Sequence, residues 1–251
     1  MRVFITGASS GLGEGLALHY ARPGAVIGVC ARRAPLLAEL AERIAARGAR
    51  AAIYAADVGD TIAMQNVAAD FLRDAGGVDL VIANAGIGIA HETLLGKSEP
   101  IAQLMVVNVI GVTNTVVPFV PMMLQQGSGT LAAVSSVAGL RGVPGRAAYS
   151  ASKAAVITFM DALRLDLQGT RVHAMTLCPG FVHTPLTASL PGKLPFVISV
   201  DEAVEQMTKA IARHSRTFVF PWQMRVLSKV FQLVPEALMR RVSPAARTKG
   251  A

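Results

Sequence analysis

The stretch Val3-Phe4-Ile5-Thr6-Gly7-Ala8-Ser9-Ser10-Gly11-Leu12-Gly13 decides the fold of this 251-residue chain. Three β-type residues lead into a turn with the glycine spacing G-x-x-x-G-x-G, and a helical pattern follows over residues 14–22. In a strand, glycine turn and helix of this kind, the amides at the helix N-terminus face an incoming anion, and the helix dipole favours its charge. The stretch therefore predicts a turn that binds the pyrophosphate of a dinucleotide.

Strand-like and helix-like segments alternate along the rest of the chain. This alternation is typical of parallel sheets with crossover helices, so we predict an α/β fold: one doubly wound, Rossmann-like parallel sheet with helices on both faces. The whole chain, 1–251, is expected to be a single domain for dinucleotide binding and catalysis. The expected strands are 3–5, 25–30, 50–55, 78–83, 130–135, 171–177 and 217–220, and the expected helices are 14–22, 35–47, 61–74, 99–124 and one from about residue 149.

The composition bears on the packing of the fold and on the cellular compartment. The chain is 52% hydrophobic but only 5% aromatic, which suits crossover helices packed closely on a sheet. Its two cysteines, Cys30 and Cys178, cannot form a disulfide framework, so a reducing compartment is expected. Only three apolar residues separate Arg2 from Thr6, which is not the pattern of a signal peptide. We therefore expect a cytoplasmic location.

Residues 104–124 are apolar enough to suggest a membrane span, but a buried crossover helix is the preferred interpretation. Asn108 lies among apolar neighbours, where its amide must find hydrogen-bond partners. A structural tie to the sheet and a role in catalysis are both open for this side chain. The residues that interrupt the apolar run are Asn108, Thr113, Asn114, Thr115, Pro118 and Pro121.

The end of the second predicted strand bears on the choice of dinucleotide. Dinucleotide-binding folds often place an acid there to hold the adenosine ribose hydroxyls, but this chain has Ala31. Arg32 and Arg33 follow, and their planar guanidinium groups suit a 2′-phosphate that an acid would repel. We therefore predict NADP rather than NAD; the alternative is two solvated arginines before the next helix.

Tyr149 and Lys153 lie four residues apart, so on a helix they share one face. An ammonium beside the phenol favours its ionised form. Lowering a tyrosine pKa from about 10 to about 7 takes roughly 4 kcal/mol, whereas a solvated pair supplies only about 1 kcal/mol. The pair is therefore a candidate acid/base only in a dry cleft with a second positive charge, such as an oxidised nicotinamide. The alternative is an ordinary surface helix.

Further candidates follow predicted strands, where a doubly wound sheet collects its ligand-binding loops. A Ser136 hydroxyl there can donate to a substrate carbonyl, although a loop serine is by default a turn former. Gly86 and Gly88 permit a turn against the cofactor. His183 is interpreted as a loop residue. The histidines are scattered and the cysteines lack ligand spacing, so no metal site is predicted.

Taken together, these motifs resemble the short-chain dehydrogenase/reductase family over about residues 1–185. Ser136 stands thirteen residues before Tyr149, which resembles the interval in that family and selects it over Ser135. The resemblance is carried, in chain order, by Thr6-Gly7-x-x-x-Gly11-x-Gly13, Asn84-Ala85-Gly86, Asn108, Ser136, Tyr149-x-x-x-Lys153 and Pro179-Gly180.

The resemblance implies a hydride transfer between a nicotinamide and a carbonyl or alcohol carbon, with four catalytic residues. Tyr149 would give or take the hydroxyl proton, and Ser136 would hold the substrate oxygen. Lys153 would lower the pKa of the tyrosine and contact the nicotinamide ribose. Asn108 would fix a water that links Lys153 to bulk solvent.

The resemblance also implies a set of cofactor-binding residues. Thr184 would hold the nicotinamide carboxamide, and Asp57-Val58 would contact the adenine. The full expected set is Gly7, Ser9, Ser10, Gly11, Leu12, Gly13, Arg32, Arg33, Asp57, Val58, Asn84, Ala85, Gly86, Tyr149, Lys153, Pro179, Gly180, Val182 and Thr184.

Residues 181–200 are expected to form a substrate loop. Their apolar side chains would line a pocket for a lipophilic ketone or alcohol under a mobile lid, or they would simply pack. These side chains are Phe181, Leu186, Leu190, Leu194, Pro195, Phe196, Val197 and Ile198.

Residues 221–251 are expected to form a basic, partly amphipathic extension. From Arg213 onward the chain has eight basic residues and one acid, so the tail carries most of the net charge of +8. Family members commonly end in a glycine-rich segment that packs in a tetramer; Pro221 and a longer basic tail replace that ending and put the tetramer in doubt. Helical spacing with a stop at Pro235 is seen for Val226, Leu227, Val230, Phe231 and Val234.

The C-terminal helix has several interpretations. Its apolar stripe would complete the protein's own core or a subunit contact, which is the preferred interpretation, or it would cover the substrate cleft. Contact with an anionic membrane surface is a further one. No nucleic-acid reading module accompanies the charge, so no nucleic-acid partner is predicted.

The sequence therefore predicts an NADP(H)-dependent oxidoreductase that acts on a small carbonyl or alcohol substrate, as a homodimer or homotetramer. The alternative is a non-catalytic NADP-binding sensor or scaffold that acts through its basic C-terminal helix.

Overall fold

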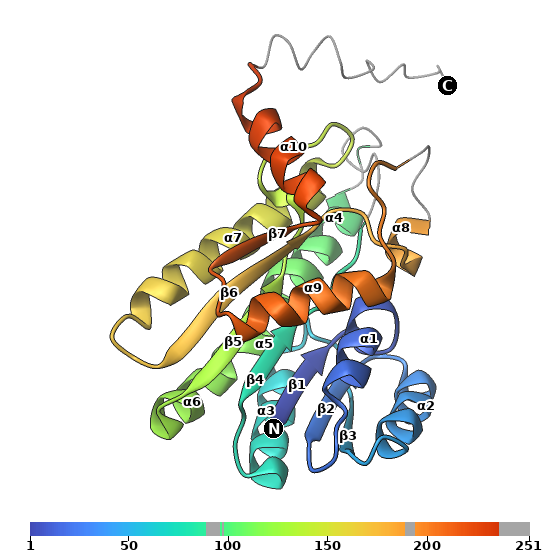
Figure 1. Cartoon of the computed structure of the whole chain (residues 1–251), viewed down its shortest axis with the longest axis vertical. Coiled ribbons are helices and arrows are strands. Elements are labelled where there is room, and N and C mark those ends of the chain that lie inside the picture. The colour runs from blue at the N-terminus through green and yellow to red at the C-terminus, as the bar shows by residue number, and fades with distance from the viewer. Residues whose placement is uncertain (89–95, 97, 189–193, 236–251) are drawn as a thin grey trace.

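A seven-stranded parallel sheet forms the centre of the protein (Figure 1). The computed structural model describes residues 1–88, 96, 98–188 and 194–235. The strand order is β3-β2-β1-β4-β5-β6-β7, so the chain winds outward from β1 in both directions and the predicted doubly wound sheet is confirmed. The strands are β1 (Arg2–Thr6), β2 (Val26–Ala31), β3 (Arg50–Ala55), β4 (Leu80–Ala83), β5 (Gly129–Val134), β6 (Val172–Pro179) and β7 (Thr217–Phe220).

The pleat of each strand divides its side chains between two buried faces. On β1, Val3 and Ile5 pack on one face, while Phe4 packs on the other, against Phe71 and Phe119. Gly28 pairs with Phe4, and a Cβ there would lie 2.7 Å from ring atoms of both Phe4 and Phe71. The missing side chain at this position therefore makes room for the aromatic cluster.

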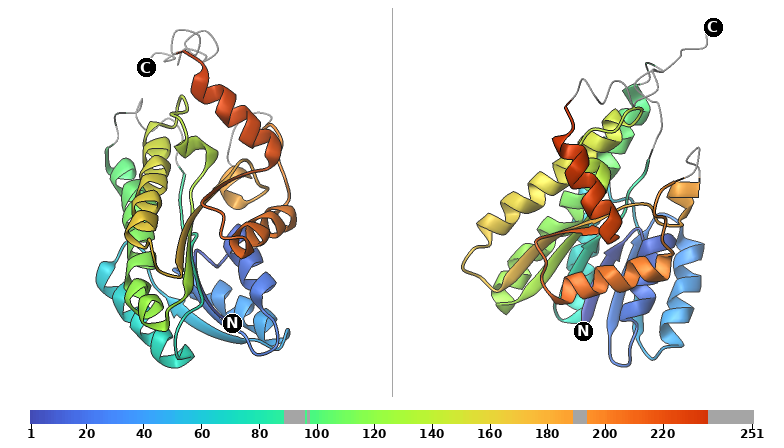
Figure 2. Two further views of the ribbon diagram at one scale, coloured as in Figure 1. Left: turned by 60° about the vertical axis from the view of Figure 1, so that its left-hand side comes forward. Right: turned by 45° about the horizontal axis from the view of Figure 1, so that its top comes forward.

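Helices cover both faces of the sheet (Figure 2). The face of Val3 and Ile5 is covered by α1 (Gly11–Tyr20), α2 (Ala34–Ala45) and α9 (Val200–Ala212). The face of Phe4 is covered by α3 (Thr61–Ala75), α7 (Ala147–Asp166) and the helical run between β4 and β5. The remaining elements are the short turns η3 (Val137–Gly139) and α8 (Pro185–Ala188) and the C-terminal helix α10 (Trp222–Leu233).

The long helix expected over 99–124 is not one regular helix. It consists of α4 (Ser98–Met105), the π-helical turn η1 (Val106–Ile110), α5 (Gly111–Val116), the 3₁₀ turn η2 (Val117–Phe119) and α6 (Val120–Gln126). Pro118 lacks a backbone N–H and breaks the i→i−4 pattern at η2. This run, Ser98–Gln126, is also long and apolar enough to span a membrane by length and composition, but half of its most apolar window is buried in the protein. The run connects β4 to β5, as expected for the crossover helix that was preferred over a membrane span.

Other boundaries differ from the sequence prediction by a few residues. Helix α1 begins at Gly11, three residues before the predicted start, because the helix starts inside the glycine turn. Helix α10 begins at Trp222, directly after Pro221. The start of α1 was predicted too late because glycine is a poor residue in helix interiors but is tolerated in a first turn. The start of α10 directly after a proline lies within the extension predicted for residues 221–251.

Candidate active site

The glycine turn between β1 and α1 is shaped for the close approach of a ligand. Gly7 has φ +66° and Gly11 has φ +59°, a region of backbone space that side chains with a Cβ rarely adopt. Ser10 is extended and precedes the first turn of α1, which leaves the first amides of the helix free for an anion. The turn thus offers the predicted pyrophosphate-binding geometry.

Gly13 is not among the residues that line the dinucleotide groove, and its place in the cofactor set stays a prediction. A Cβ at this position would lie 2.3 Å from the Gly7 carbonyl oxygen and 2.6 Å from Asn84 Nδ2. The absence of a side chain at the third glycine therefore lets α1 pack closely against the turn.

Asn84 ties the end of β4 to this turn. Its Nδ2 donates to the carbonyls of Thr6 and Gly7 at 3.1 and 3.2 Å, and its backbone N–H donates to the Thr6 hydroxyl at 3.2 Å. The Asn84 side chain therefore bonds to neighbouring backbone and also lines the groove.

The predicted cofactor residues, apart from Gly13, come together around one groove of about 530 Å³ at the carboxyl ends of the strands. They include the glycine turn, the ends of β2, β3 and β4, and the loop after β6, so residues far apart in sequence meet at one edge of the sheet. Gly88, also expected to turn against the cofactor, and Leu186, expected to line the substrate pocket, border the same groove. The groove also contains residues that were not predicted to lie there: Ala31, Ala56, Ile87, Val107, Val134, Ser135, Pro185 and Thr187.

The two arginines at the end of β2 differ in their contacts. Arg33 reaches back over the glycine turn, where its Nη2 donates to the hydroxyls of Ser9 and Ser10 at 2.8 Å each. Arg32 lies 3.7 Å from Asp57 and is more than half exposed. Arg33, Ser9 and Ser10 thus form a polar, cationic end of the groove, where the residues present fit a phosphate group.

Ser136 is held in place by the packing of the η3 turn on helix α7. A Cβ on Gly139 would lie 2.6 Å from the carbonyl carbon of Lys153, so the turn sits directly on the helix backbone. The Ser135 hydroxyl donates to the Lys153 carbonyl at 2.7 Å. The Ser136 hydroxyl accepts from the Ala138 N–H at 3.2 Å and begins the turn. Because Tyr149 also lies on α7, these contacts fix the position of Ser136 relative to Tyr149.

Tyr149 and Lys153 lie on the buried side of α7, as the i, i+4 spacing predicts. The Lys153 Nζ lies 5.8 Å from the centre of the Tyr149 ring and donates to the Val134 carbonyl at 3.1 Å. Both side chains are less than 10% exposed. The surface-helix alternative is therefore wrong for this pair.

The electrostatics of the pair differ from the sequence prediction. Burial raises the pKa of Tyr149, an effect opposed by the Ser136 hydroxyl and the charge of Arg146. Burial lowers the pKa of Lys153 to about 8. The predicted lowering of the tyrosine pKa by Lys153 is not found in the protein alone, because the same burial that brings the pair together disfavours both charges.

Asn108 lies in the π-helical turn η1 and is completely buried. Its Nδ2 donates to the Ile87 carbonyl at 2.9 Å and to the Ser152 hydroxyl at 3.1 Å, and its Oδ1 accepts from the Ile87 N–H at 2.8 Å. The amide therefore ties the loop after β4 to the helical run, which supports the structural interpretation of this residue. A catalytic role in holding a water stays a prediction.

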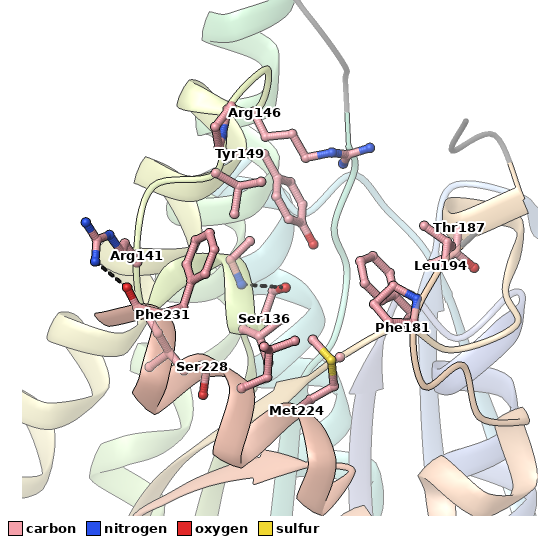
Figure 3. A pocket seen from close by; sticks show the side chains of 18 of the residues that line it. Ser136, Arg141, Arg146, Tyr149, Phe181, Thr187, Leu194, Met224, Ser228 and Phe231 are labelled. Atoms are coloured by element: carbon pink, nitrogen blue, oxygen red, sulfur yellow. Dashed lines mark hydrogen bonds between the residues drawn. The ribbon is translucent and has the colours of Figure 1, made fainter. Parts of the chain in front are cut away.

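A second, more apolar cleft of about 380 Å³ adjoins the groove (Figure 3). In Figure 3 the Tyr149 ring points its hydroxyl into this cleft, between Ser136 and Phe181. Ser136 and Tyr149 line both the groove and the cleft. The apolar walls come from Val137, Leu140, Val143, Pro144, Phe181, Leu186, Leu194, Pro195, Met224, Leu227 and Phe231.

The predicted substrate segment contributes only some of its side chains to the cleft. Phe181, Leu186, Leu194 and Pro195 line it, whereas Phe196, Val197 and Ile198 do not. The Ile198 N–H donates to the Phe181 carbonyl, and the Ile198 carbonyl accepts from the His183 N–H. With its backbone held in this way, the Ile198 side chain packs against the hydrophobic core. Leu190 lies outside the described residues.

Helix α10 supplies a wall of the cleft that the sequence analysis did not assign to particular residues. Met224, Leu227 and Phe231 face the cleft, so covering the cleft is the interpretation that the structure supports for this side of the helix. Arg141 donates to the Phe231 carbonyl and attaches the helix to the loop after η3. Arg146, also missed, lies with its guanidinium 5.7 Å from the centre of the Tyr149 ring.

The two cysteines and His183 are the remaining residues that were considered from the sequence. Cys30 and Cys178 are buried and unpaired. Within the described part of the chain, no three side chains of the metal-binding types come together. His183 lies in the loop after β6, as expected, and its backbone N–H donates to the Ile198 carbonyl.

Comparison with known proteins agrees with this geometry. Residues 1–194 match the family model described as short chain dehydrogenase. An uncharacterized oxidoreductase of Myxococcus xanthus is 40% identical over 234 residues, which cover 93% of this chain and 92% of the relative.

Solved structures resemble the fold over its full length. A short-chain dehydrogenase from Sphingobium yanoikuyae in complex with NADPH superposes with a TM-score of 0.82 at 26% identity, covering 100% of this chain and 98% of that one. A short chain dehydrogenase/reductase from Burkholderia phymatum in complex with NAD has a TM-score of 0.84 at 24% identity, with the same coverage.

The fold and the site together define an oxidoreductase that binds a nicotinamide cofactor and acts on a small molecule. The chain belongs to the short-chain dehydrogenase/reductase family.

Replacing Lys153 with methionine is expected to stabilise the protein at neutral pH while abolishing activity. Burial lowers the pKa of this lysine from an ordinary value of 10.5 to about 8, so at pH 7 the buried cation costs about 3 kcal/mol of folding free energy. Loss of its hydrogen bond to Val134 offsets about 1–2 kcal/mol of that gain. We expect a net increase of about 1–2 kcal/mol in the free energy of unfolding at pH 7, measured by urea denaturation.

The pH dependence provides the control for Lys153→Met. Because the unfolded state binds more protons than the folded state between pH 8 and 10.5, the wild type gains stability as the pH rises through this window. The advantage of the variant should therefore disappear by about pH 10. A variant that is less stable than the wild type at pH 7 would contradict the assignment of Lys153 as a buried, destabilised cation.

Proposed function

We propose that the protein is an NADP(H)-dependent oxidoreductase that transfers a hydride between the nicotinamide and the carbon of a lipophilic carbonyl or secondary alcohol. The observation that carries the proposal is the position of Ser136 and Tyr149, which line both the dinucleotide groove and the apolar cleft. A substrate oxygen between these two hydroxyls would place its carbon at the junction of the two cavities.

The chain's own residues would handle the oxygen and its proton. When bound, the dinucleotide supplies the hydride in reduction and accepts it in oxidation. In reduction the Tyr149 phenol donates its proton to the substrate oxygen as the C–H bond forms, and in oxidation the phenolate takes that proton back. The Ser136 hydroxyl donates a hydrogen bond to the same oxygen.

Burial suits Tyr149 to this role because it keeps the proton on the phenol in the resting protein. Lys153, held beneath the ring by the Val134 carbonyl, would stabilise the phenolate left after the proton is transferred. Its low pKa also makes it a group that can exchange a proton near neutral pH.

A lipophilic substrate is supported by the lining of the cleft. Aromatic, aliphatic and methionine side chains from η3, the loop after β6 and α10 form most of its wall. Arg141 and Arg146 are the cationic side chains among its lining residues, and both lie in the segment between η3 and α7. The comparisons give no support to a non-catalytic sensor or scaffold.

Tyr149→Phe tests the proposed chemistry. The variant keeps the ring and its packing but lacks the proton donor, so we expect kcat for any accepted carbonyl to fall by about 10²–10⁴. The affinity for NADPH, measured by fluorescence titration, should stay within about twofold, since removal of one hydroxyl leaves the groove otherwise intact. Tyr54→Phe, on the far strand β3, is the matched control and should retain full activity. Undiminished turnover in Tyr149→Phe would exclude the mechanism.

NADP is favoured over NAD by the cationic end of the groove. No acid stands at the end of β2, and Arg33 lies over Ser9 and Ser10 where a 2′-phosphate would be bound. The similar protein from Sphingobium yanoikuyae is in complex with NADPH, while the one from Burkholderia phymatum is in complex with NAD. The choice of dinucleotide therefore depends on the residues of this chain.

Arg33→Ala is expected to raise KM for NADPH about 10- to 100-fold and to leave KM for NADH nearly unchanged, because a charged hydrogen bond to phosphate is worth about 1.5–3 kcal/mol. Arg32→Ala is the matched comparison, and it should have a smaller effect because Arg32 lies beside Asp57. If the ratio of KM for NADPH to KM for NADH is the same in both variants as in the wild type, neither arginine binds the 2′-phosphate.

Homo-oligomer formation is part of the proposed function. Large apolar side chains are exposed along the helical run between β4 and β5, namely Met105, Val106, Ile110, Val117 and Leu124. Light scattering should give a molar mass of two or four times the 26.2 kDa chain, and Ile110→Lys with Val117→Lys should shift it toward the monomer. A monomeric wild type would contradict this part of the proposal.

A further inference from the structure

Helix α10 has two apolar faces, and only one of them belongs to the cleft. Met224, Leu227 and Phe231 turn toward the cleft. The opposite side carries an outer stripe, defined as Trp222, Val226, Val230 and Leu233, which repeats at i, i+4, i+8 and i+11. These four side chains are between 53% and 84% exposed, and no described residue covers them.

The outer stripe lies on the surface of the protein and is not part of its hydrophobic core. Helix α10 leans on β7 and η3 and projects beyond the carboxyl edge of the sheet, away from the helices that cover its two faces (Figures 1 and 2). A single exposed leucine or valine needs no explanation, but four aligned apolar side chains that include a tryptophan form a continuous patch.

The charges beside the stripe have one sign. Arg225 and Lys229 are exposed at the edge of the outer stripe, and α10 contains no acidic residue. An apolar stripe with tryptophan, bordered by cations, is the pattern of helices that lie in the interface of an anionic bilayer, where the ring enters the headgroup region and the cations meet lipid phosphates.

We propose that the outer stripe of α10 docks this protein on an anionic membrane surface. A second copy of the chain is a poorer occupant, since a two-fold contact through the same stripe would bring Arg225 and Lys229 toward their own counterparts. The inner face of the same helix lines the cleft, so docking would place the apolar cleft beside the lipid. Docking itself does not depend on the proposed reaction, because vesicle binding is measured without turnover.

Trp222 provides a direct probe because it is the single tryptophan of the chain. We expect its emission to shift to the blue when the full chain is mixed with vesicles of phosphatidylcholine and phosphatidylglycerol, and the protein to sediment with them. Pure phosphatidylcholine vesicles should bind at least tenfold more weakly, and salt should release the protein from the anionic ones.

Paired variants test the stripe. Val226→Ser with Val230→Ser should weaken binding to the anionic vesicles by at least tenfold. Ile62→Ser with Leu165→Ser, at two apolar sites elsewhere that are even more exposed, should leave binding unchanged. Arg225→Gln with Lys229→Gln should abolish the preference for anionic lipid. These variants lie outside the cleft, so turnover of a soluble substrate should be retained.

Three results would overturn the proposal. The first is absence of binding to the anionic vesicles, and the second is equal binding by the wild type and the Val226/Val230 variant. The third is a blue emission of Trp222 without lipid, which would mean that protein already covers the stripe; a shift to the red on dilution would identify that protein as a second copy.

Discussion

The burial of a phenol and an ammonium in one dry niche is the constraint on which the site depends. Desolvation disfavours the charged form of each, so it raises the pKa of Tyr149 and lowers that of Lys153. The resting pair therefore keeps the proton on the phenol, as the proposed role of proton donor requires. Ser136 and Arg146 act in the opposite direction on the phenol, and a positive charge in the adjoining groove would add to them. A cationic nicotinamide ring bound in the groove would therefore favour ionisation of the phenol.

The fold holds this niche through close backbone contacts rather than through long side chains. Gly139 lets the η3 turn sit on the backbone of α7, and the Ser135 hydroxyl bonds to the carbonyl of Lys153. Asn108 ties the loop after β4 to the helical run behind it. Because these contacts join the ends of β4 and β5 to α7, the hydroxyls of Ser136 and Tyr149 are fixed by the sheet itself. Helix α10 then closes the cleft from a separate part of the chain.

Features encoded by local pattern could be predicted from the sequence, whereas features that depend on distant packing could not. The doubly wound parallel sheet follows from the alternation of segments, and the shared face of Tyr149 and Lys153 follows from helical spacing. The role of Gly13 could not be foreseen because it depends on the approach of the Gly7 carbonyl and Asn84. The π-helical turn around Asn108 leaves no periodic signal. Met224 and Phe231 reach the cleft only because β7 returns the chain to the sheet edge, and Ile198 turns to the core for the same kind of reason.

A spectroscopic titration of tyrosine ionisation tests the central claim most directly. The chain has three tyrosines, and burial raises the pKa of Tyr20 and raises that of Tyr54 to about 12, so neither interferes near pH 10. The account predicts no tyrosinate absorbance up to about pH 10 in the protein alone, and one ionising tyrosine below that pH once oxidised NADP is added, absent in Tyr149→Phe. A tyrosine that ionises at its ordinary pKa without dinucleotide, or no response to dinucleotide, would contradict the account.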